Sequence, residues 1–576
     1  MELGSLDFLI IIVFFALYLI IGVLVARQSG KNATNFFLSG RNMPWWILGV
    51  SMVATTFAAD TPGLVAGIVR KDGVSGNWIW WCFLLTGMLT VFFYSKLWRK
   101  SNITTDLEFY ELRYSGKSAA FLRGFRAIYL GVFFNIVIMA GVCLAAIKIG
   151  HVIFDLSAVN SLLIASSITT IYSLLGGLKG VLLTDFIQFI IALGGSIWAT
   201  IYILNLDQIG GLDGLLNHQN VSDQLAFFPD FSQPKNYIPM LVIPLAVQWW
   251  SVWYPGAEPG GGGYIVQRML AAKNKAHATK ATLFFNIMHY AVRPWPWILI
   301  GLASLIIFPE TASLAKAFPE LDKSFIKPDL SYAAMLKFLP TGLIGLVITS
   351  LIAAFMSTIS THLNWGSSYV VNDFYVRFIK PDASSRQQVI IGRLSIVFMM
   401  LAAALLALVL QEAREAFNLL LQIGAGTGLL FIVRWFWKRV NPYSEITAMS
   451  VSFLIALIFF LSDHGKIPEI GIKDHWRLVI GVIITSIAWI SVSLLTHPSD
   501  ASKLKSFNER IFDEQSKFKY ASAKIFGFFG GVIGVYGTLF GTGLFLYGEY
   551  ILGSFSVFIS ALGFIAILIN WKKIID

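Results

Sequence analysis

The chain has 576 residues, of which 56% are hydrophobic and only 13% carry a charge, and its mean hydropathy is +0.71. Soluble domains carry about 25% charged residues, so this composition excludes a soluble globular protein and predicts an all-α protein that crosses a membrane many times. The two cysteines, Cys82 and Cys143, lie in apolar runs, which excludes a disulfide framework and a thiolate metal site.

About fifteen apolar runs have the length of roughly 20 residues that a membrane-spanning helix needs. The first run lacks the basic start and the small-residue cleavage site of a signal peptide, so we interpret it as a helix that stays in the membrane. The approximate predicted spans are 7–26, 45–69, 77–98, 120–149, 157–177, 181–205, 237–256, 279–308, 341–372, 388–410, 416–437, 444–462, 477–496, 524–547 and 550–571.

Lys and Arg residues gather in alternate loops, for example Arg99 and Lys100 in one and Lys273 and Lys275 in another. Cytoplasmic loops carry the excess of Lys and Arg, so this pattern predicts an amino terminus outside and a carboxyl terminus, with Lys572, in the cytoplasm. The net charge of +11 then reflects topology and not nucleic-acid binding. We expect a multi-pass protein of the inner cell membrane, surrounded by lipid bilayer.

The longest hydrophilic stretches are about 206–236, 309–330 and 497–522, and none has the length of a kinase or a dinucleotide-binding domain. The phosphate-binding sequence GxxxxGK[ST] does not occur, so ATP-driven pumping by this chain is not expected. Paired histidines or clustered carboxylates, which a membrane enzyme would need, are not evident in the sequence either. We therefore expect a protein that is not an enzyme and that has no nucleic-acid or obligate protein partner.

Two of the apolar segments are interrupted by polar and helix-breaking residues. The second contains ATTFAADTPG at 54–63, and the seventh ends in WYPGAEPGGGG at 253–263. Broken helices at corresponding positions are typical of transporters built from inverted repeats. The breaks lie five segments apart. Because five is an odd number, the two repeats would have opposite orientations in the membrane. The expected organisation is an extra N-terminal helix and loop (1–44), a first five-helix repeat (45–205), a second (206–440) and four peripheral helices (441–576).

The polar break in the second segment suits a small hard cation. Carbonyl groups released where a membrane helix unwinds carry partial negative charge and must line protein or a wet cavity. Asp60 lies about fifteen residues from Trp45 and about ten from Arg70, well inside the segment, where an ionisable group is expensive and usually functional. The alternative is a simple proline kink with Asp60 at the membrane interface.

Two further segments carry polar side chains. Asp185 lies about one turn inside the sixth apolar run and shares a helix face with Gln188. The alternative to a functional role is a carboxylate at the helix end, in the membrane interface. The stretch AAFMSTISTH at 353–362 concentrates hydroxyl groups, and sodium, like other hard cations, prefers oxygen ligands. Serine and threonine hydroxyls in a membrane helix also commonly bond only a carbonyl of their own helix. A sodium site and a set of hydroxyls without a ligand role are therefore both open interpretations. The hydroxyls belong to Ser357, Thr358, Ser360 and Thr361.

Several motifs, in this order along the chain, resemble the sodium:solute symporter family. They are FFLSGRNMPWW before the second segment, GGL with a downstream TDFIQ in the sixth, VQRMLAAK after the seventh, and the hydroxyl cluster of the ninth. The likeness spans most of residues 7–437. It implies the leucine-transporter type of fold, with two inverted five-helix repeats, plus peripheral helices. Gly180 departs from the family pattern, which usually has Ala, Ser or Pro after GGLK.

The resemblance implies a sodium site shared by the family. Its ligands are three backbone carbonyls at the break and in the ninth segment, together with two hydroxyl groups. The corresponding residues are Ala54, Phe57, Ala354, Ser357 and Thr358.

The resemblance also implies a second sodium site, found in some members slightly further inward. Its ligands correspond to Asp185, Ser357, Ser360 and Thr361. Asp60 matches an acidic position that some members need for sodium coupling.

Sugar-transporting members of the family contact the solute from their third, seventh, eighth and eleventh segments. An aromatic-rich cavity suits stacking on a sugar ring, whereas a membrane-buried Arg293 suits a carboxylate. An internal ion pair of Arg293 with Asp60 or Glu258 is the alternative. The predicted solute-binding residues are Asp60, Thr56, Thr61, Trp80, Glu258, His289, Arg293 and Gln422.

The sequence therefore predicts a secondary active transporter that couples inward flow of one or two sodium ions to uptake of a small polar organic solute by alternating access. A sugar or polyol is the expected solute, and a carboxylate or amino acid is the alternative. A transporter-like sensor and a channel are the competing classes. The sequence shows no signalling domain that a sensor would use, and a channel would not concentrate its solute.

Overall fold

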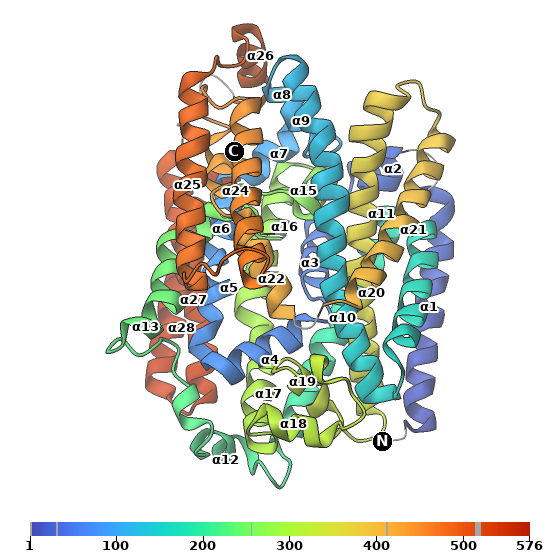
Figure 1. Ribbon diagram of the computed structural model, residues 1–576, viewed down its shortest axis with the longest axis vertical. Helices are drawn as coiled ribbons and strands as arrows, with labels where there is room; N and C mark the ends of the chain where they lie inside the picture. Colours follow the sequence, from blue (N-terminus) through green and yellow to red (C-terminus); the bar gives the residue numbers. More distant parts are fainter. Residues whose placement is uncertain (1–2, 30–32, 255, 411–412, 513–519, 576) are drawn as a thin grey trace.

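The computed structural model describes residues 3–29, 33–254, 256–410, 413–512 and 520–575. These residues form helices joined by loops, and the only bridges of β type among them are two isolated ones, Met43 with Ala272 and Val252 with Ala425. Most helices run roughly along the long axis of the molecule, and the two chain ends lie toward its opposite ends (Figure 1). The prediction of an all-α protein is confirmed.

The first part of the chain contains the long central helix α10 and the bent helix α11. Short 3-10 or π-helical turns (η) continue several of the α-helices and merge them into longer rods. The helices are α1 Ser5–Ser29, α2 Ala33–Leu38, η1 Ser39–Arg41, α3 Trp45–Thr55, α4 Thr61–Asp72, η2 Val74–Asn77, α5 Trp78–Trp81, α6 Phe83–Leu89, η3 Thr90–Tyr94, α7 Ser95–Ser101, α8 Glu108–Arg113, α9 Gly116–Ile128, η4 Tyr129–Phe134, α10 Asn135–Phe154 and α11 Ala158–Leu204.

The middle of the chain begins with a long loop that carries short helices and ends with the helix pair α22 and α23. The helices are α12 Gly211–Asn217, η5 Ser222–Gln224, α13 Pro234–Tyr237, η6 Ile238–Val242, η7 Pro244–Gln248, α14 Trp249–Ser251, α15 Gly263–Ala271, α16 Lys275–Ile287, η8 Met288–Val292, α17 Pro294–Ile307, α18 Thr311–Ala317, η9 Lys323–Phe325, α19 Leu330–Leu336, α20 Leu343–Tyr369, η10 Val370–Ile379, α21 Ser385–Ala407, α22 Ala413–Gly424 and α23 Gly428–Val433.

The last part of the chain forms a peripheral set of helices, with α24 and α25 adjoining the core and α27 and α28 packed against each other. The short helix α26 lies at one end of the molecule (Figure 1). The helices are α24 Pro442–Asp463, α25 Asp474–Leu495, α26 Ala501–Ile511, α27 Ala521–Leu546 and α28 Tyr550–Ile575.

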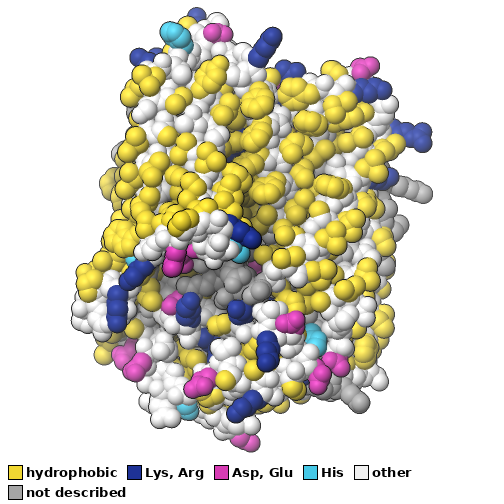
Figure 2. Space-filling view, viewed as in Figure 1, with side chains coloured by type: hydrophobic (Ala, Val, Ile, Leu, Met, Phe, Trp, Pro, Cys, Tyr) yellow, Lys and Arg dark blue, Asp and Glu magenta, His cyan; other side chains and the backbone are white. Residues whose placement is uncertain are grey.

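Ten helical rods in the described part of the chain are long and apolar enough to cross a membrane, and shorter apolar helices include α3. The helices at the centre of the molecule are more buried than those at its periphery. In the most apolar stretch of Leu343–Ile379, 89% is buried inside the protein, but in that of Tyr550–Ile575 only 22% is buried. A broad band of hydrophobic side chains covers one face, with charged side chains gathered above and below it (Figure 2). The rod that contains α20 therefore forms the centre, while α28 faces lipid.

The predicted break in the second apolar segment is present between α3 and α4. Proline lacks an N–H group, and its ring clashes with the carbonyl four residues earlier, so Pro62 prevents a helix from continuing through Ala58. The new helix begins at Thr61 and has this proline in its first turn, where proline is well accommodated. Residues 56–60 are left without helical structure in the middle of the molecule.

The predicted break in the seventh segment lies between α14 and α15. Gly260 and Gly261 have φ angles of 77° and 86°, a region that residues with a side chain avoid. The extended segment pairs with a third interruption, between α22 and α23, where the N–H of Trp253 donates to the carbonyl of Gly424 at 3.2 Å. Pro255, part of the predicted PGAEPGGGG break, lies outside the described residues.

The predicted fifth and sixth spans meet in α11 at Gly177, whose φ of 54° and ψ of −171° interrupt the helical backbone. This bend aligns the second part of α11, which carries Asp185, with α20. The hydroxyl of Ser357 on α20 donates to Asp185 at 2.6 Å. The polar residues predicted on separate segments are thus brought together at the core of the fold.

Candidate functional site

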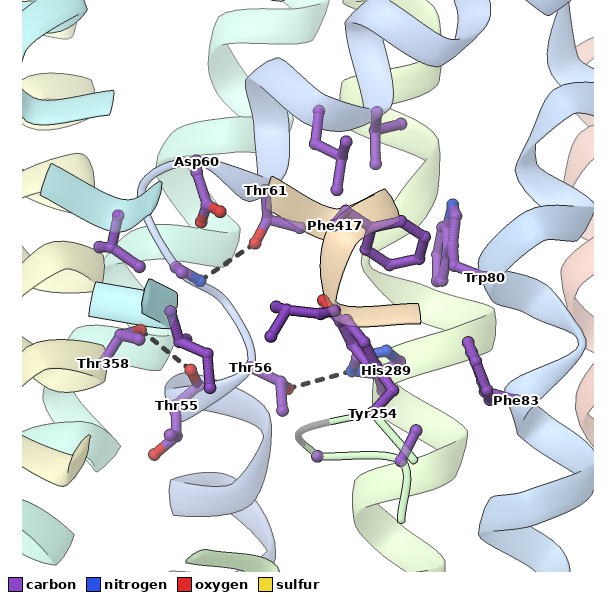
Figure 3. Close-up of a pocket in the computed structure, with 18 of the residues that line it drawn as sticks. Thr55, Thr56, Asp60, Thr61, Trp80, Phe83, Tyr254, His289, Thr358 and Phe417 are labelled. Carbon is purple, nitrogen blue, oxygen red and sulfur yellow. Dashed lines mark hydrogen bonds between the residues drawn. The ribbon is translucent and has the colours of Figure 1, made fainter. Parts of the chain in front are cut away.

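A cavity of about 130 Å³ lies beside the break between α3 and α4. Side chains from α5, α6, α10, η8, α20 and α22 and from the break after α14 also line it (Figure 3). Six of the eight residues predicted to bind solute lie on its wall. These are Thr56, Asp60, Thr61, Trp80, His289 and Arg293.

The carboxylate of Asp60 lies at the start of α4, at the upper side of the cavity in Figure 3. One of its oxygens, Oδ1, is buried and has no hydrogen-bond partner among the described residues. The neighbouring Thr61 hydroxyl accepts a bond from the N–H of Ala58 at 3.2 Å, which holds the turn in place. A buried acceptor without a partner is costly, so a solute hydroxyl or an ion is the natural partner for Asp60.

Arg293 belongs to a polar cluster on the opposite side of the break. Its Nη1 donates to the hydroxyl of Thr56 at 3.2 Å and to the carbonyl of Val53 at 3.3 Å, and its Nη2 lies 3.2 Å from Nε2 of His289. A guanidinium has no acceptor, so Nε2 of His289 must accept and Nδ1 must carry the proton. Nδ1 then donates to Thr56 at 3.0 Å.

The internal ion pair considered for Arg293 is not formed within the described residues. The positive charge instead lies over the ring of Trp297 at 5.4 Å, and the Nε atom is buried with no hydrogen-bond partner there. Arg293 is therefore held in position by neutral groups and keeps one donor for a further partner.

Aromatic rings form much of the cavity wall. Trp80 stacks on Tyr290 with ring centres 5.9 Å apart, and Tyr254 packs against Phe83 at 5.7 Å and Phe417 at 4.8 Å. The sequence pointed to Trp80 but not to the other four rings, because their positions depend on how distant helices meet. Flat apolar walls combined with a few polar groups suit a ring-shaped polar solute.

Two residues predicted to bind solute lie away from this cavity. Glu258 is buried in the break after α14, where its Oε2 accepts from the N–H of Gly256 at 3.0 Å. Gln422 on α22 lines a separate cavity together with Asp72 and His475. The structure therefore does not bring Glu258 and Gln422 together with Asp60.

The residues predicted for the first sodium site lie where α20 meets the break in α3. The hydroxyl of Thr358 donates to the carbonyl of Thr55 at 2.9 Å, which joins the two helices next to Ala54 (Figure 3). The N–H of Phe57 donates to the carbonyl of Ala54 at 3.1 Å, whereas no hydrogen bond to the carbonyl of Phe57 occurs within the described part of the chain. A set of oxygen atoms with a free carbonyl among them fits a sodium ion.

The residues predicted for the second sodium site have other partners. Ser51 and Ser357 both donate to the carboxylate of Asp185. Ser360 donates to the carbonyl of Ser357 at 3.1 Å, within its own helix. The hydroxyl of Thr361 accepts from Nη2 of Arg268 at 2.7 Å.

Sequence reasoning missed Arg268 and Ser51. The motif VQRMLAAK contains Arg268, but nothing in its spacing indicates that the side chain reaches Asp185. A charged residue in an otherwise apolar stretch is a general signal for a buried partner. That signal was available for Arg268, whose side chain is fully buried.

Comparison with known families gives one match that covers most of the chain. The model of the sodium:solute symporter family matches residues 36–451. That range includes both breaks, α20 and every residue of the two predicted sodium sites.

Curated relatives match over similar lengths. A sodium/glucose cotransporter of Vibrio parahaemolyticus is 27% identical, covering 86% of this chain and 92% of the relative. A sodium/sialic acid symporter of Proteus mirabilis is also 27% identical, covering 84% and 95%. A sodium/myo-inositol cotransporter 2 of Oryctolagus cuniculus is 24% identical, covering 85% and 77%.

A solved structure of a Na⁺-coupled sialic acid symporter, in a substrate-bound outward-open state, superposes with a TM-score of 0.67. It is 22% identical to this chain and covers 86% of it and 99% of its own length. This likeness supports the leucine-transporter type of fold, with its two inverted repeats, that was predicted. The family match and the shared fold lead to one conclusion: the chain belongs to the sodium:solute symporter family.

Proposed function

We propose that the chain couples inward movement of sodium to uptake of a small polar solute by alternating access. The observation that carries this proposal is the junction of α20 with the break in α3, directly beside a solute-sized cavity. The Thr358 hydroxyl lies on the cavity wall and also contacts the break. Sodium bound there would stabilise one side of the cavity, and it drives transport only because it binds one conformation better than the other.

The sodium gradient supplies enough free energy for strong accumulation. One charge moving through 100 mV contributes about 2.3 kcal/mol. A tenfold sodium gradient adds about 1.4 kcal/mol. Together they support roughly 500-fold solute accumulation for each sodium ion.

A polyhydroxylated ring, such as a sugar or a cyclic polyol, is the solute that the cavity favours. Its hydroxyl groups can donate to Oδ1 of Asp60 and accept from Nε of Arg293, two buried atoms of the cavity-lining residues that have no hydrogen-bond partner among the described residues. Its apolar face can pack on Trp80. Relatives that act on glucose and myo-inositol support this class.

An acidic solute is the second candidate. Arg293 can hold a carboxylate, because no internal carboxylate pairs with it within the described residues. The relative that acts on sialic acid, an acidic sugar by its name, supports this alternative.

We also propose how the chain is oriented in the membrane and how it is divided into repeats. The amino terminus lies outside and the carboxyl terminus in the cytoplasm, following the Lys and Arg bias of the loops. The segments 45–205 and 206–440 are the two repeats, 1–44 is an added N-terminal helix and loop, and 441–576 are peripheral helices. The position of the chain ends toward opposite ends of the molecule fits an odd number of crossings (Figure 1).

Uptake into proteoliposomes tests the proposal. Purified protein is reconstituted, and radiolabelled glucose, myo-inositol, sialic acid and proline are each offered under an inward sodium or potassium gradient. We expect concentrative uptake of at least one ring-shaped polyol with sodium and none with potassium. Uptake that only equilibrates would indicate a channel, and sodium-dependent solute binding without uptake would indicate a sensor.

Replacing Arg293 by glutamine separates the two solute classes. A hydrogen bond from a charged group contributes about 1.5–3 kcal/mol, so we expect the apparent affinity for the transported solute to fall by about 10- to 100-fold. A carboxylate solute would lose the charge pairing as well, so its neutral analogue would then be the less affected of the two.

Competition of neutral and acidic analogues for uptake measures this effect. Arg377→Gln is the control, because Arg377 is 43% exposed and pairs with Glu111 away from the cavity. Unchanged affinity for every analogue in the Arg293 variant would show that Arg293 does not contact the solute.

A further inference from the structure

Glu258 is a buried carboxylate, in the loop between α14 and α15, that neither the solute cavity nor the predicted sodium sites use. Its residue is only 4% exposed, and its Oε2 accepts the N–H of Gly256 at 3.0 Å. Its Oε1 is buried and has no hydrogen-bond partner among the described residues. An ionisable group inside a membrane-spanning segment is costly and usually has a function.

No positive charge compensates Glu258 within the described part of the chain, where it forms no ion pair. The charged group that acts on it is a second carboxylate, that of Asp106. Oδ2 of Asp106 accepts the N–H of Gly263 at 3.0 Å, and its Oδ1 accepts the hydroxyl of Tyr369. Like charges disfavour ionisation, and hydrogen-bond donors favour it. Asp106 has two donors and Glu258 has one, so Asp106 keeps the negative charge and Glu258 takes a proton.

The other ionisable groups near this loop do not alter that balance. Phenols titrate near pH ~10, and a buried imidazole stays neutral. The one arginine among them lies 3.6 Å from the carboxylate of Glu445. These groups are Tyr94, Tyr254, Tyr264, His362, Tyr369 and Arg434.

The backbone packs closely around the free oxygen of Glu258. A Cβ added at Gly263 would lie 2.9 Å from Oε1 and 3.2 Å from Cζ2 of Trp365, and one at Gly262 would lie 3.0 Å from Cγ of Glu258. These neighbours have no side-chain oxygen, whereas a hard metal ion needs several oxygen ligands. A proton needs only the one carboxylate oxygen, so a proton is the ligand that fits here.

The loop 256–263, which we call the gate loop, closes one side of the solute cavity. Gly256 and Ala257 line that cavity, and Glu258 holds the N–H of Gly256. The gate loop lies on the side of the cavity opposite Asp60 (Figure 3). The chain continues from it through α15 to Lys273, in a loop proposed to face the cytoplasm. In alternating access, solute leaves on this side only when the gate loop moves, and the movement brings Glu258 to cytoplasmic water.

We propose that Glu258 is a proton-binding site of the gate loop, which carries a proton while the loop is closed and releases it to cytoplasmic water when the loop opens. On opening, the carboxyl O–H bond breaks, the proton passes to water, and a hydrated carboxylate remains. On closing, a proton returns from the cytoplasm, so the cycle moves no net proton across the membrane. This inference rests on the proposed uptake by alternating access, and it makes that uptake sensitive to cytoplasmic pH.

Infrared spectroscopy of the purified protein in detergent tests the proton site without any transport step. A protonated carboxylic acid has a carbonyl stretching band that a carboxylate lacks. At neutral pH we expect Glu258→Gln to lose the intensity of one acid group from this band. Glu111→Gln is the matched control and should leave the band unchanged, because Glu111 pairs with Arg123 and Arg377, each at 2.7 Å. Equal bands in Glu258→Gln and the wild type would overturn the inference and leave sodium-coupled transport standing.

Uptake into proteoliposomes of set internal and external pH tests the link to the gate loop. When the open carboxylate has its usual acidity, closure binds one proton, so each unit of internal pH makes closure about tenfold less favourable. We expect wild-type uptake to fall by up to about tenfold for each unit of internal pH and not to respond to external pH. Glu258→Gln is always neutral and can still accept the N–H of Gly256, so its uptake should not depend on internal pH.

The outcomes separate the proton site from the proposed function. Internal pH dependence that persists in folded Glu258→Gln, or wild-type uptake that ignores internal pH, would overturn the proton site alone. Absence of sodium-dependent uptake at every internal pH would overturn the proposed function itself. Should Glu258→Gln fail to fold, the wild type decides: a response to internal and not to external pH supports the proton site, and any other pattern contradicts it.

Discussion

Replacing Thr358 by alanine is expected to raise the sodium concentration for half-maximal uptake by about 10- to 100-fold, because one hydrogen-bonding contact to a charged group contributes about 1.5–3 kcal/mol. The hydroxyl of Thr358 is the side-chain oxygen that reaches the break in α3, where it bonds the carbonyl of Thr55. Its loss removes a proposed sodium ligand and also the hydrogen bond that joins α20 to α3. Sodium titration of solute uptake in proteoliposomes measures the change.

Thr349→Ala is the matched control for this experiment. Thr349 is a buried threonine on the same helix, but its hydroxyl donates only to the carbonyl of Gly345, one turn earlier. Thr358→Ser, which keeps the hydroxyl, is expected to restore most of the sodium affinity. Equal sodium requirements in Thr358→Ala and Thr349→Ala would remove Thr358 from the ion site.

Replacing Glu445 by alanine is expected to destabilise the folded protein by about 3–5 kcal/mol, the usual cost of leaving a buried ion-pair partner uncompensated. Oε2 of Glu445 on α24 lies 3.0 Å from Nη1 of Arg126, and its Oε1 lies 3.6 Å from Nη1 of Arg434. All three side chains are at least 95% buried. Tyr114 also donates to Glu445, at 2.9 Å.

Thermal unfolding of purified protein in detergent, followed by size-exclusion chromatography, measures this effect. We expect the midpoint for Glu445→Ala to fall by several degrees. Glu445→Gln, which can still accept the Tyr114 bond, should fall less. Glu509→Ala is the control, because its pair with Lys505 is exposed and such pairs contribute about 0–1 kcal/mol. A midpoint for Glu445→Ala equal to that of Glu509→Ala would show that α24 is held by apolar packing alone.

The helical architecture was predictable because membrane spans are set by length and hydropathy. The segments of apolar sequence fall on the observed helices, and Pro62 and the glycines of 260–263 mark the breaks. These signals come from short stretches of the chain, so they can be recognised in a single sequence. The third break, between α22 and α23, was not predicted, since its position depends on backbone pairing of Gly424 with the distant Trp253.

The site was predictable only in part, because its chemistry depends on which helices meet. Asp60 and Arg293 were found since charged groups inside apolar runs are conspicuous. Glu258 is equally conspicuous, yet it bonds its own loop and does not line the cavity. Arg268, within α15, carries the same signal, but nothing in the sequence indicates that its side chain reaches Asp185 on α11.

A pair of high-resolution maps, recorded with the protein in sodium and in choline, tests the central claim most directly. The difference between the maps should show one ion between α20 and the unwound segment after α3. We expect it to contact the carbonyl oxygens of Ala54, Phe57 and Ala354 and the hydroxyls of Ser357 and Thr358. Sodium-dependent density at another place, or none at all between these two helices, would contradict the account.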